Sequence, residues 1–163
     1  MKNLKDIILG HLEYPKFSIY ERLHINKDTG NNSYNYYPKT SNELEELIKK
    51  LIKERGNNAD LNDIDTSEIT DMQFMFYGSS FNGDISTWDV SNVKNMKYMF
   101  AFSKFNGDIS NWNVSNVENM TCMFKKSNFN GDISEWDVSK VKYMWHMFFR
   151  SPLEKNPPKW YKE

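Results

Sequence analysis

The stretch FNGDISTWDVSNVKNMKYMF, residues 81–100, is the key to the architecture because the chain repeats it at a fixed interval. Close copies begin at Phe105 and Phe129, so successive copies start 24 residues apart. A degenerate copy precedes them and a truncated one follows, in the same register. A fixed period of about 20–29 residues is typical of solenoid proteins, in which each repeat stacks on its neighbours.

Each repeat contains an alternating segment followed by a segment with helical spacing. Ile85, Trp88 and Val90 fit the L-x-x-L-x-L strand signature of leucine-rich repeats. Residues 93–100 then place apolar side chains at three- and four-residue intervals, which predicts a short helix. The predicted fold is therefore a leucine-rich-repeat-like α/β solenoid, with short parallel strands each followed by a short helix. The Asn82-Gly83 pair leaves a β-hairpin as an alternative, although a corner before a parallel strand fits the fixed period better.

The 24-residue register also divides the chain. Residues 57–152 hold four repeats, and residues 153–163 hold a partial fifth that we expect to cap the C-terminal end. For residues 40–56 the sequence predicts an amphipathic capping helix, because leucine and isoleucine recur at three- and four-residue intervals and so share one face. Residues 1–39 form an N-terminal arm, for which a short helix with a loose hairpin and a disordered segment are both open.

Side chains at equivalent positions are expected to stack as columns through the core, since repeats of a solenoid pack like onto like. The indole N–H of a buried tryptophan needs a hydrogen-bond partner, and we expect backbone carbonyls to provide it. The columns are Phe81, Phe105, Phe129 with Leu153; Trp88, Trp112, Trp136 with Trp160; and Met96, Met120 with Met144.

Composition and targeting signals exclude several classes of protein. The formal net charge is −1, which gives no electrostatic argument for binding nucleic acid or an anionic membrane. The single cysteine, Cys122, cannot form an internal disulfide, and we expect it to be a packing residue. No apolar run reaches the roughly 18 residues of a membrane helix, and the N-terminal region lacks a signal peptide, so we expect a cytoplasmic protein.

No motif indicates catalysis, a cofactor or a metal, so we expect a protein that is not an enzyme. His11, His24 and His146 are far apart, and the serines that recur do so as part of every repeat. Acidic positions also recur in columns, and two interpretations are open: calcium bridging, or Asx turns in which each carboxylate accepts backbone N–H bonds. We favour Asx turns, because the nonapeptide pattern of calcium-binding β-rolls is absent.

The units at 84–100, 108–124 and 132–148, which share the pattern DIS-x-W-D/N-V-S, resemble the repeats of BspA-like leucine-rich-repeat surface proteins. The same unit occurs in Mycoplasma lipoproteins of unknown function. The resemblance covers residues 57–152 and implies a binding role, since the BspA-like family is associated with adhesion and protein binding. It implies no catalytic residues.

We therefore expect a non-catalytic protein-binding scaffold that uses the strand face of the solenoid. Two outward columns are the candidate partner-binding residues: Asp63, Thr87, Asn111 and Glu135, and Asp65, Asp89, Asn113 and Asp137. The alternatives are a structural or virion-associated protein that docks through its N-terminal arm, with a phage or mobile-element origin, and a surface adhesin if the chain is secreted. The identity of the partner and the oligomeric state are open.

Overall fold

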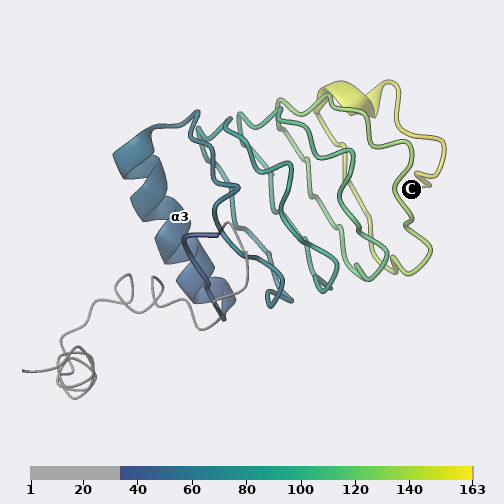
Figure 1. Ribbon diagram of the computed structural model, residues 1–163. Coiled ribbons are helices and arrows are strands. Elements are labelled where there is room, and N and C mark those ends of the chain that lie inside the picture. The colour runs from purple at the N-terminus through teal and green to yellow at the C-terminus, as the bar shows by residue number, and fades with distance from the viewer. Residues whose placement is uncertain (1–33, 163) are drawn as a thin grey trace, which may run out of the picture.

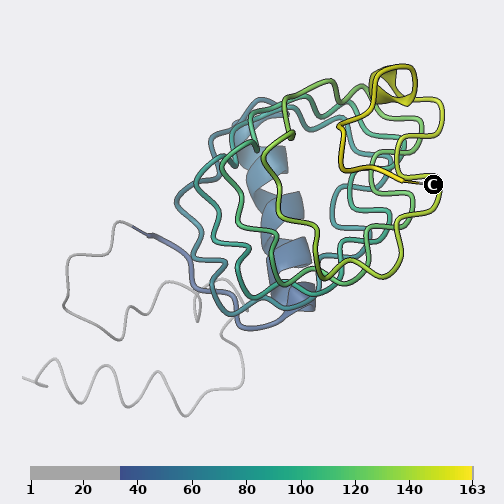
Figure 2. The same ribbon diagram turned by 90° about the vertical axis from the view of Figure 1, so that its right-hand side faces the viewer.

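The computed structural model describes residues 34–162. The chain forms a row of coils that stack side by side, with helix α3 across one end and the C-terminal segment at the other (Figure 1). Viewed along the row, the coils superimpose and enclose a common interior (Figure 2). The expectations for residues 1–33 of the arm fall outside the described part of the chain.

Helix α3 spans Ser41–Arg55 and covers the first coil with its apolar face. Its buried side chains are Leu44, Leu47, Ile48 and Leu51. Leu44, Leu47 and Leu51 are fully buried, because they pack against the core of the first coil. Without the helix, this core would be exposed to water.

Both ends of α3 carry capping residues. The Oγ1 of Thr40 accepts a hydrogen bond of 3.2 Å from the backbone N–H of Glu43. The carboxylate of Glu43 in turn accepts one of 2.7 Å from the backbone N–H of Lys39. Gly56 ends the helix at φ 90°, a left-handed conformation that glycine adopts without steric cost.

The leucine-rich-repeat-like α/β prediction is wrong within the repeats. In the chain from residue 34 to residue 162, α3 and a single 3₁₀ turn, η1 (Pro152–Glu154), are the only helices, and no β-sheet forms. Backbone pairing is limited to isolated bridges, all of them parallel, so the hairpin alternative is not observed either. One series of bridges joins Asp71, Asn95, Asn119 and Tyr143, in or just before the segments for which the sequence predicts helices.

Consecutive tight turns replace the predicted helix of each repeat. The four coils correspond to the four repeats, residues 57–80, 81–104, 105–128 and 129–152. In the second coil, the backbone N–H groups of Met99, Ala101 and Ser103 each bond to the carbonyl three residues earlier. Tyr98 and Phe102 lie at φ 56° and 60°, which is incompatible with a right-handed helix. A helix of about eight residues has little stability alone, and these residues gain other backbone partners from the neighbouring coil.

Those partners form a ladder of hydrogen bonds between coils. The N–H groups of Met72, Phe74, Phe76 and Gly78 donate to the carbonyls of residues 95, 97, 99 and 101 at 2.8–3.1 Å. The next two pairs of coils repeat the pattern. Alternate residues thus bond within their own coil and to the next one, so the irregular backbone keeps its polar groups paired.

The core follows the columns that the sequence predicts. Phe81, Phe105 and Phe129 stack nearly parallel at centroid distances of 6.2 and 6.3 Å. Trp88 and Trp112 stack at 6.5 Å with an interplanar angle of 1°. Aromatic pairs in such arrangements add stability beyond the area they bury.

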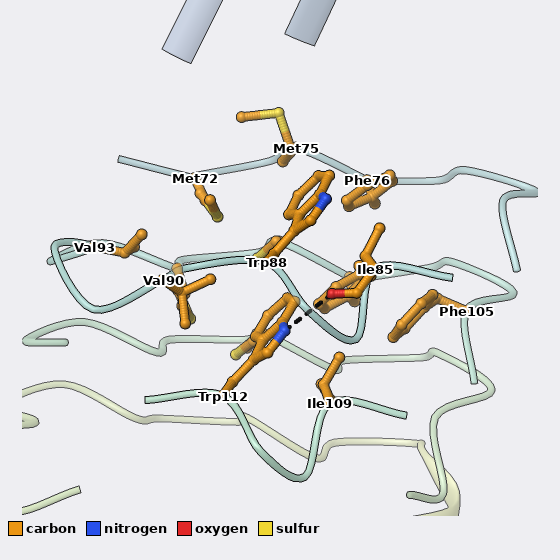
Figure 3. Close-up of a cluster of buried hydrophobic side chains, with 14 of the residues drawn as sticks. Met72, Met75, Phe76, Ile85, Trp88, Val90, Val93, Phe105, Ile109 and Trp112 are labelled. Atoms are coloured by element: carbon orange, nitrogen blue, oxygen red, sulfur yellow. Dashed lines mark hydrogen bonds between the residues drawn. The ribbon is translucent and has the colours of Figure 1, made fainter. Parts of the chain in front are cut away.

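Each tryptophan of the column also bonds to the preceding coil. The indole N–H of Trp112 donates to the carbonyl of Ile85 at 3.1 Å (Figure 3). Trp88, Trp136 and Trp160 make the same bond to a carbonyl 27 residues earlier. The expectation that backbone carbonyls accept these bonds is confirmed.

The Asn-Gly pairs serve the close approach of coils rather than a left-handed turn. A Cβ at position 83 would lie 2.0 Å from the carbonyl oxygen of Ala59, so only glycine fits there. The side-chain oxygen of Asn82 accepts a hydrogen bond of 2.7 Å from the backbone N–H of Asn106, and Asn106 does the same for Asn130. The pairs therefore form an asparagine ladder along the stack.

We expect Trp112→Ala to lower the free energy of unfolding by about 3–5 kcal/mol, because it removes a fully packed ring and leaves a cavity. Trp145→Ala is the matched control, since the Trp145 side chain is 69% exposed. Urea unfolding followed by circular dichroism measures both variants. Equal losses in the two would contradict the tryptophan column.

A second prediction concerns Gly78, which lies at φ 65° and has no atom within 4 Å of the position that a Cβ would occupy. Gly78→Val is expected to cost about 1–2 kcal/mol, because a β-branched residue is strained in the left-handed region. Gly78→Asn is expected to cost much less, since asparagine tolerates that region. Thermal unfolding compares the two variants, and equal melting temperatures would show that the position is not constrained by its backbone angle.

Candidate binding surface

The structure places the two predicted columns on one corner of successive coils, where neighbouring coils also bond to each other. The side-chain amide of Asn92 donates to the carbonyl of Ser67 at 2.8 Å, and that of Asn116 donates to the carbonyl of Ser91 at 2.7 Å. Asn111 and Glu135 are exposed there. This corner is a polar surface on irregular backbone and not the strand face that the sequence predicts.

Two members of the first column already have structural partners. Asp63 is held by Arg55 and by the side chain of Asn35 at 2.9 Å. Thr87 donates its hydroxyl, and its backbone N–H, to the side-chain oxygen of Asn62, both at 2.9 Å. A partner protein that used these residues would have to compete with contacts inside the scaffold.

The second column consists of Asx turns. The side-chain oxygens of Asp89 and Asp137 accept backbone N–H bonds of 2.9 and 3.0 Å from Ser91 and Ser139. Asp65 and Asn113 accept the same bond from Ser67 and Ser115. This is the arrangement that we favoured over calcium bridging, and no group of three or more acidic, histidine or cysteine side chains suited to a metal occurs in the described chain.

A further acidic column makes the same turns. Asp84, Asp108 and Asp132 accept backbone N–H bonds of 2.9–3.0 Å from Ser86, Ser110 and Ser134. These bonds favour the charged form and lower the pKa of the three carboxyl groups. The recurring acidic residues therefore stabilise the bends of each coil.

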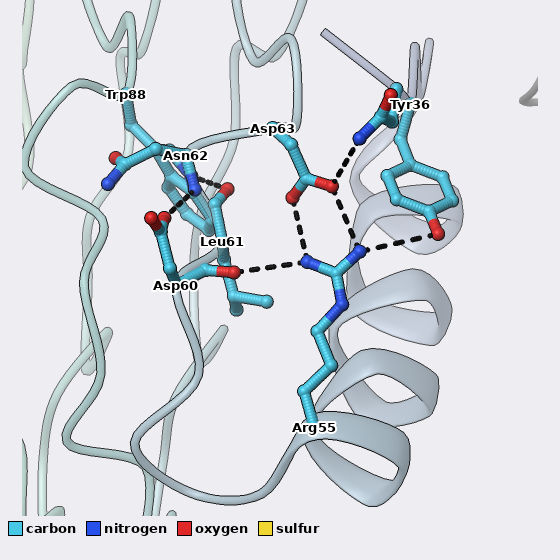
Figure 4. Close-up of polar contacts among 8 residues, drawn as sticks. Tyr36, Arg55, Asp60, Leu61, Asn62, Asp63 and Trp88 are labelled. Carbon is cyan, nitrogen blue, oxygen red and sulfur yellow. Dashed lines mark hydrogen bonds and ion pairs between the residues drawn. The ribbon is translucent and has the colours of Figure 1, made fainter.

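Arg55, at the end of α3, fastens the helix to the first coil. Its guanidinium donates two hydrogen bonds of 2.9 Å to the carboxylate of Asp63 and one of 3.0 Å to the carbonyl of Asp60 (Figure 4). The guanidinium carbon of Arg55 also lies over the Tyr36 ring, 5.7 Å from the ring centroid. Burial opposes the charge of Asp63, but the hydrogen bonds from Arg55 and Asn35 outweigh it and lower its pKa.

A pKa below the usual value means that the Asp63 contact stabilises the fold above about pH 4 and loses this effect as the pH falls through the folded-state pKa. Asp63→Asn is therefore expected to lower the free energy of unfolding by about 1.5 kcal/mol at pH 7, and by much less at pH 3. Glu45→Gln is the control, because its pair with Lys49 is exposed. A loss for Asp63→Asn that does not change between pH 7 and pH 3 would contradict this assignment.

The sequence did not predict a row of exposed aromatic side chains in the first two coils. They lie on the edge formed by the consecutive tight turns, which we call the turn edge. Phe74, Tyr77 and Phe102 are 44%, 49% and 42% exposed, and Tyr98 lies between them. Phe74 stacks on Tyr98 at 5.1 Å, and Tyr77 contacts Phe102 at 5.4 Å. We call these four residues the aromatic ridge.

Phe74, Tyr98, Cys122 and His146 occupy equivalent positions in the four repeats. Of these, only Cys122 is buried, as expected for a packing residue. Its neighbour Tyr98 has a raised pKa because of a hydrogen bond with Cys122. The signal for the ridge was the change of residue type along this column, from aromatic in the first two coils to cysteine and histidine in the last two.

Basic residues and a groove border the ridge. The ammonium groups of Lys97 and Lys126 lie 5.8 and 5.2 Å from the ring centroids of Tyr98 and Phe102. The turn-edge segments 72–83, 96–107 and 120–131 contain no aspartate or glutamate. On its other side, a groove of about 440 Å³ separates the ridge from α3. The ridge is thus apolar, with a positive border on the side of Lys97 and Lys126 and the Glu45–Lys49 ion pair across the groove.

These features define an exposed aromatic surface on a repeat protein of stacked coils with a helical cap. The chain matches the family described as Mycoplasma protein of unknown function, DUF285, over residues 43–160. The match covers more than half of the chain, and the protein belongs to that family. No curated protein and no solved structure matches the chain. None of the helices between residues 34 and 162 has the length and apolar character to cross a membrane.

Proposed function

We propose that the protein is a non-catalytic protein-binding scaffold and that the aromatic ridge is its contact surface. The observation that carries the proposal is the exposure of Phe74, Tyr77 and Phe102 side by side on a hydrogen-bonded stack. Contiguous exposed apolar side chains on a monomer mark interaction surfaces. Aromatic residues also contribute a large share of binding energy where proteins meet.

The ridge suits a protein partner for two physical reasons. The coils beneath it are fixed by the backbone ladder, so its side chains lose little conformational freedom on binding. Lys97 and Lys126 border the rings, which favours a partner with acidic groups around an apolar centre. The resemblance of the repeat to BspA-like surface proteins, a family associated with adhesion and protein binding, agrees with this proposal.

The ridge is also better placed than the corner columns. Asp63 and Thr87 are occupied within the scaffold, and the second column forms the Asx turns. Asn111 and Glu135 remain exposed on the corner. The corner is therefore the natural comparison surface for a test.

The test compares two variants in the capture of proteins from a lysate of the native host. The ridge variant carries Phe74→Asn, Tyr77→Asn and Phe102→Asn, since asparagine tolerates the positive φ of Phe74 and Phe102. The corner variant carries Asn111→Lys and Glu135→Lys. We expect the ridge variant to lose at least roughly tenfold in partner affinity, a difference of about 1.4 kcal/mol, and the corner variant to keep it.

Circular dichroism must show that both variants fold, since surface substitutions away from special features usually cost within about 0.5 kcal/mol. Loss of the partner from the corner variant alone would move the contact surface to the predicted columns. Retention by the ridge variant at wild-type affinity would overturn the role of the ridge.

A further inference from the structure

The last coil ends the backbone ladder with donors that have no acceptor. In the third coil, the N–H groups of residues 120, 122, 124 and 126 donate to carbonyls of the fourth coil at 2.7–3.0 Å. The corresponding donors of the fourth coil include the N–H groups of Met144, Phe148 and Arg150. None of these three bonds to another residue of the described chain. The direction of the ladder leaves them facing away from the stack.

The same coil exposes aromatic side chains where the other coils are polar. Tyr143 is 55% exposed and Trp145 is 69% exposed. The positions equivalent to Tyr143 hold Asp71, Asn95 and Asn119, and those equivalent to Trp145 hold Gln73, Lys97 and Thr121. Terminal repeats normally present a polar outer face. The fourth coil instead exposes two aromatic side chains, as an interaction surface does.

The core is open beside these two residues. Val117 and Met120 are fully buried in the third coil, whereas their equivalents Val141 and Met144 are only partly buried. The C-terminal segment covers the other half of this end, where Trp160 stacks on Trp136 at 6.5 Å. Figure 2 shows this segment across one side of the last coil. The uncovered half combines the unpaired N–H groups of Met144 and Arg150 with apolar core and exposed rings. Phe148 lies under the C-terminal segment, where it is 1% exposed and packs against Trp160 and Tyr161.

We propose that an extended segment of a partner protein adds to this end as a further rung, accepting hydrogen bonds from Met144 and Arg150 and covering Tyr143 and Trp145. Pairing an extended segment with an open backbone edge is an established mode of recognition. As in the proposed function, the partner is a protein. The contact surface is different, because it is the end of the stack and not the ridge.

The ladder argues against a second copy of the chain at this end. Along residues 144–150, two copies related by a twofold axis would bring donors of one copy against donors of the other, because an isologous interface pairs the same surface. A head-to-tail arrangement would need the opposite end of the stack, which α3 covers. A separate extended segment can present carbonyls without either conflict.

Charge narrows the chemistry of the partner segment. Between Asp137 and Glu154 the chain has no acidic residue, whereas Lys140, Lys142 and Arg150 are exposed there. Lys142 is paired with Glu118 of the preceding coil. The segment is therefore expected to be extended, apolar at its centre and acidic at its flank.

The first coil supplies a probe with this chemistry. A synthetic peptide of residues 67–80, SEITDMQFMFYGSS, contains two acidic residues and an apolar centre, and it has no cysteine. In the repeat register it aligns with residues 139–152, so its carbonyls are spaced as the ladder requires. A scrambled peptide of the same composition is the control.

The experiment measures amide hydrogen exchange of the full chain with and without peptide. In the free chain, Met144 and Arg150 should exchange faster than Met120 and Lys126, their bonded equivalents. Peptide at about 1 mM should slow exchange at Met144 and Arg150 by roughly tenfold, and the scrambled peptide should not. Trp145→Lys should weaken the effect by roughly tenfold, whereas Tyr77→Asn, on the ridge, should not change it.

Three results would overturn the proposal: slow exchange of Met144 and Arg150 in the free chain, no protection by the peptide, or equal protection in Trp145→Lys. Self-association that disappears in Trp145→Lys, measured by sedimentation, would make a second copy the occupant and would also overturn it. Because Tyr77→Asn reports on the ridge and Trp145→Lys on the end of the stack, failure of one proposal is distinguishable from failure of the other.

Discussion

The backbone hydrogen bonds between consecutive coils are the interaction on which the rest of the structure depends. Each coil lacks a helix or strand of its own, so its N–H and C=O groups would be costly to bury without the neighbouring coil. Along residues 72–78, 96–102 and 120–126, the ladder supplies partners to every second residue, and tight turns supply them to most of the residues between. This arrangement requires left-handed residues such as Tyr98 and Phe102, whose conformational cost is offset only when coils are stacked.

Stacking also explains why the core is built from columns. Once the ladder sets the register, equivalent side chains of neighbouring coils lie against each other, and flat rings such as Trp88 and Trp112 can stack nearly parallel. The indole N–H then reaches the carbonyl of the preceding coil, so a large aromatic side chain is buried without an unpaired donor. Along residues 72–78, 96–102 and 120–126 the ladder runs in one direction, from each coil to the next, and the fourth coil therefore keeps free donors there. At the opposite end, α3 covers the first coil.

Most polar side chains that recur with the repeat contribute to the scaffold. Aspartates close Asx turns, asparagines of the Asn-Gly pairs connect adjacent coils, and Arg55 fastens the cap. Residues that recur in this way are poor candidates for binding a partner, because binding would disturb the fold. The exposed aromatic residues of the ridge and of the last coil do not close turns or connect coils through their side chains. We therefore expect the residues that differ between repeats, rather than those that recur in every repeat, to bind the partner.

The sequence by itself determined the 24-residue register, the core columns, the partner of the tryptophan N–H and the capping helix, because each depends on local spacing or on repetition. It did not determine the backbone of the repeat: the spacing of Val93, Met96 and Met99 fits a helix and also a series of tight turns. It placed the corner residues but not the ridge, since Phe74 and Tyr98 look like core residues if the segment is taken as a helix. Only the stacked structure decides both points, because hydrogen bonds to the neighbouring coil select the turns, and the turns set which side chains face water.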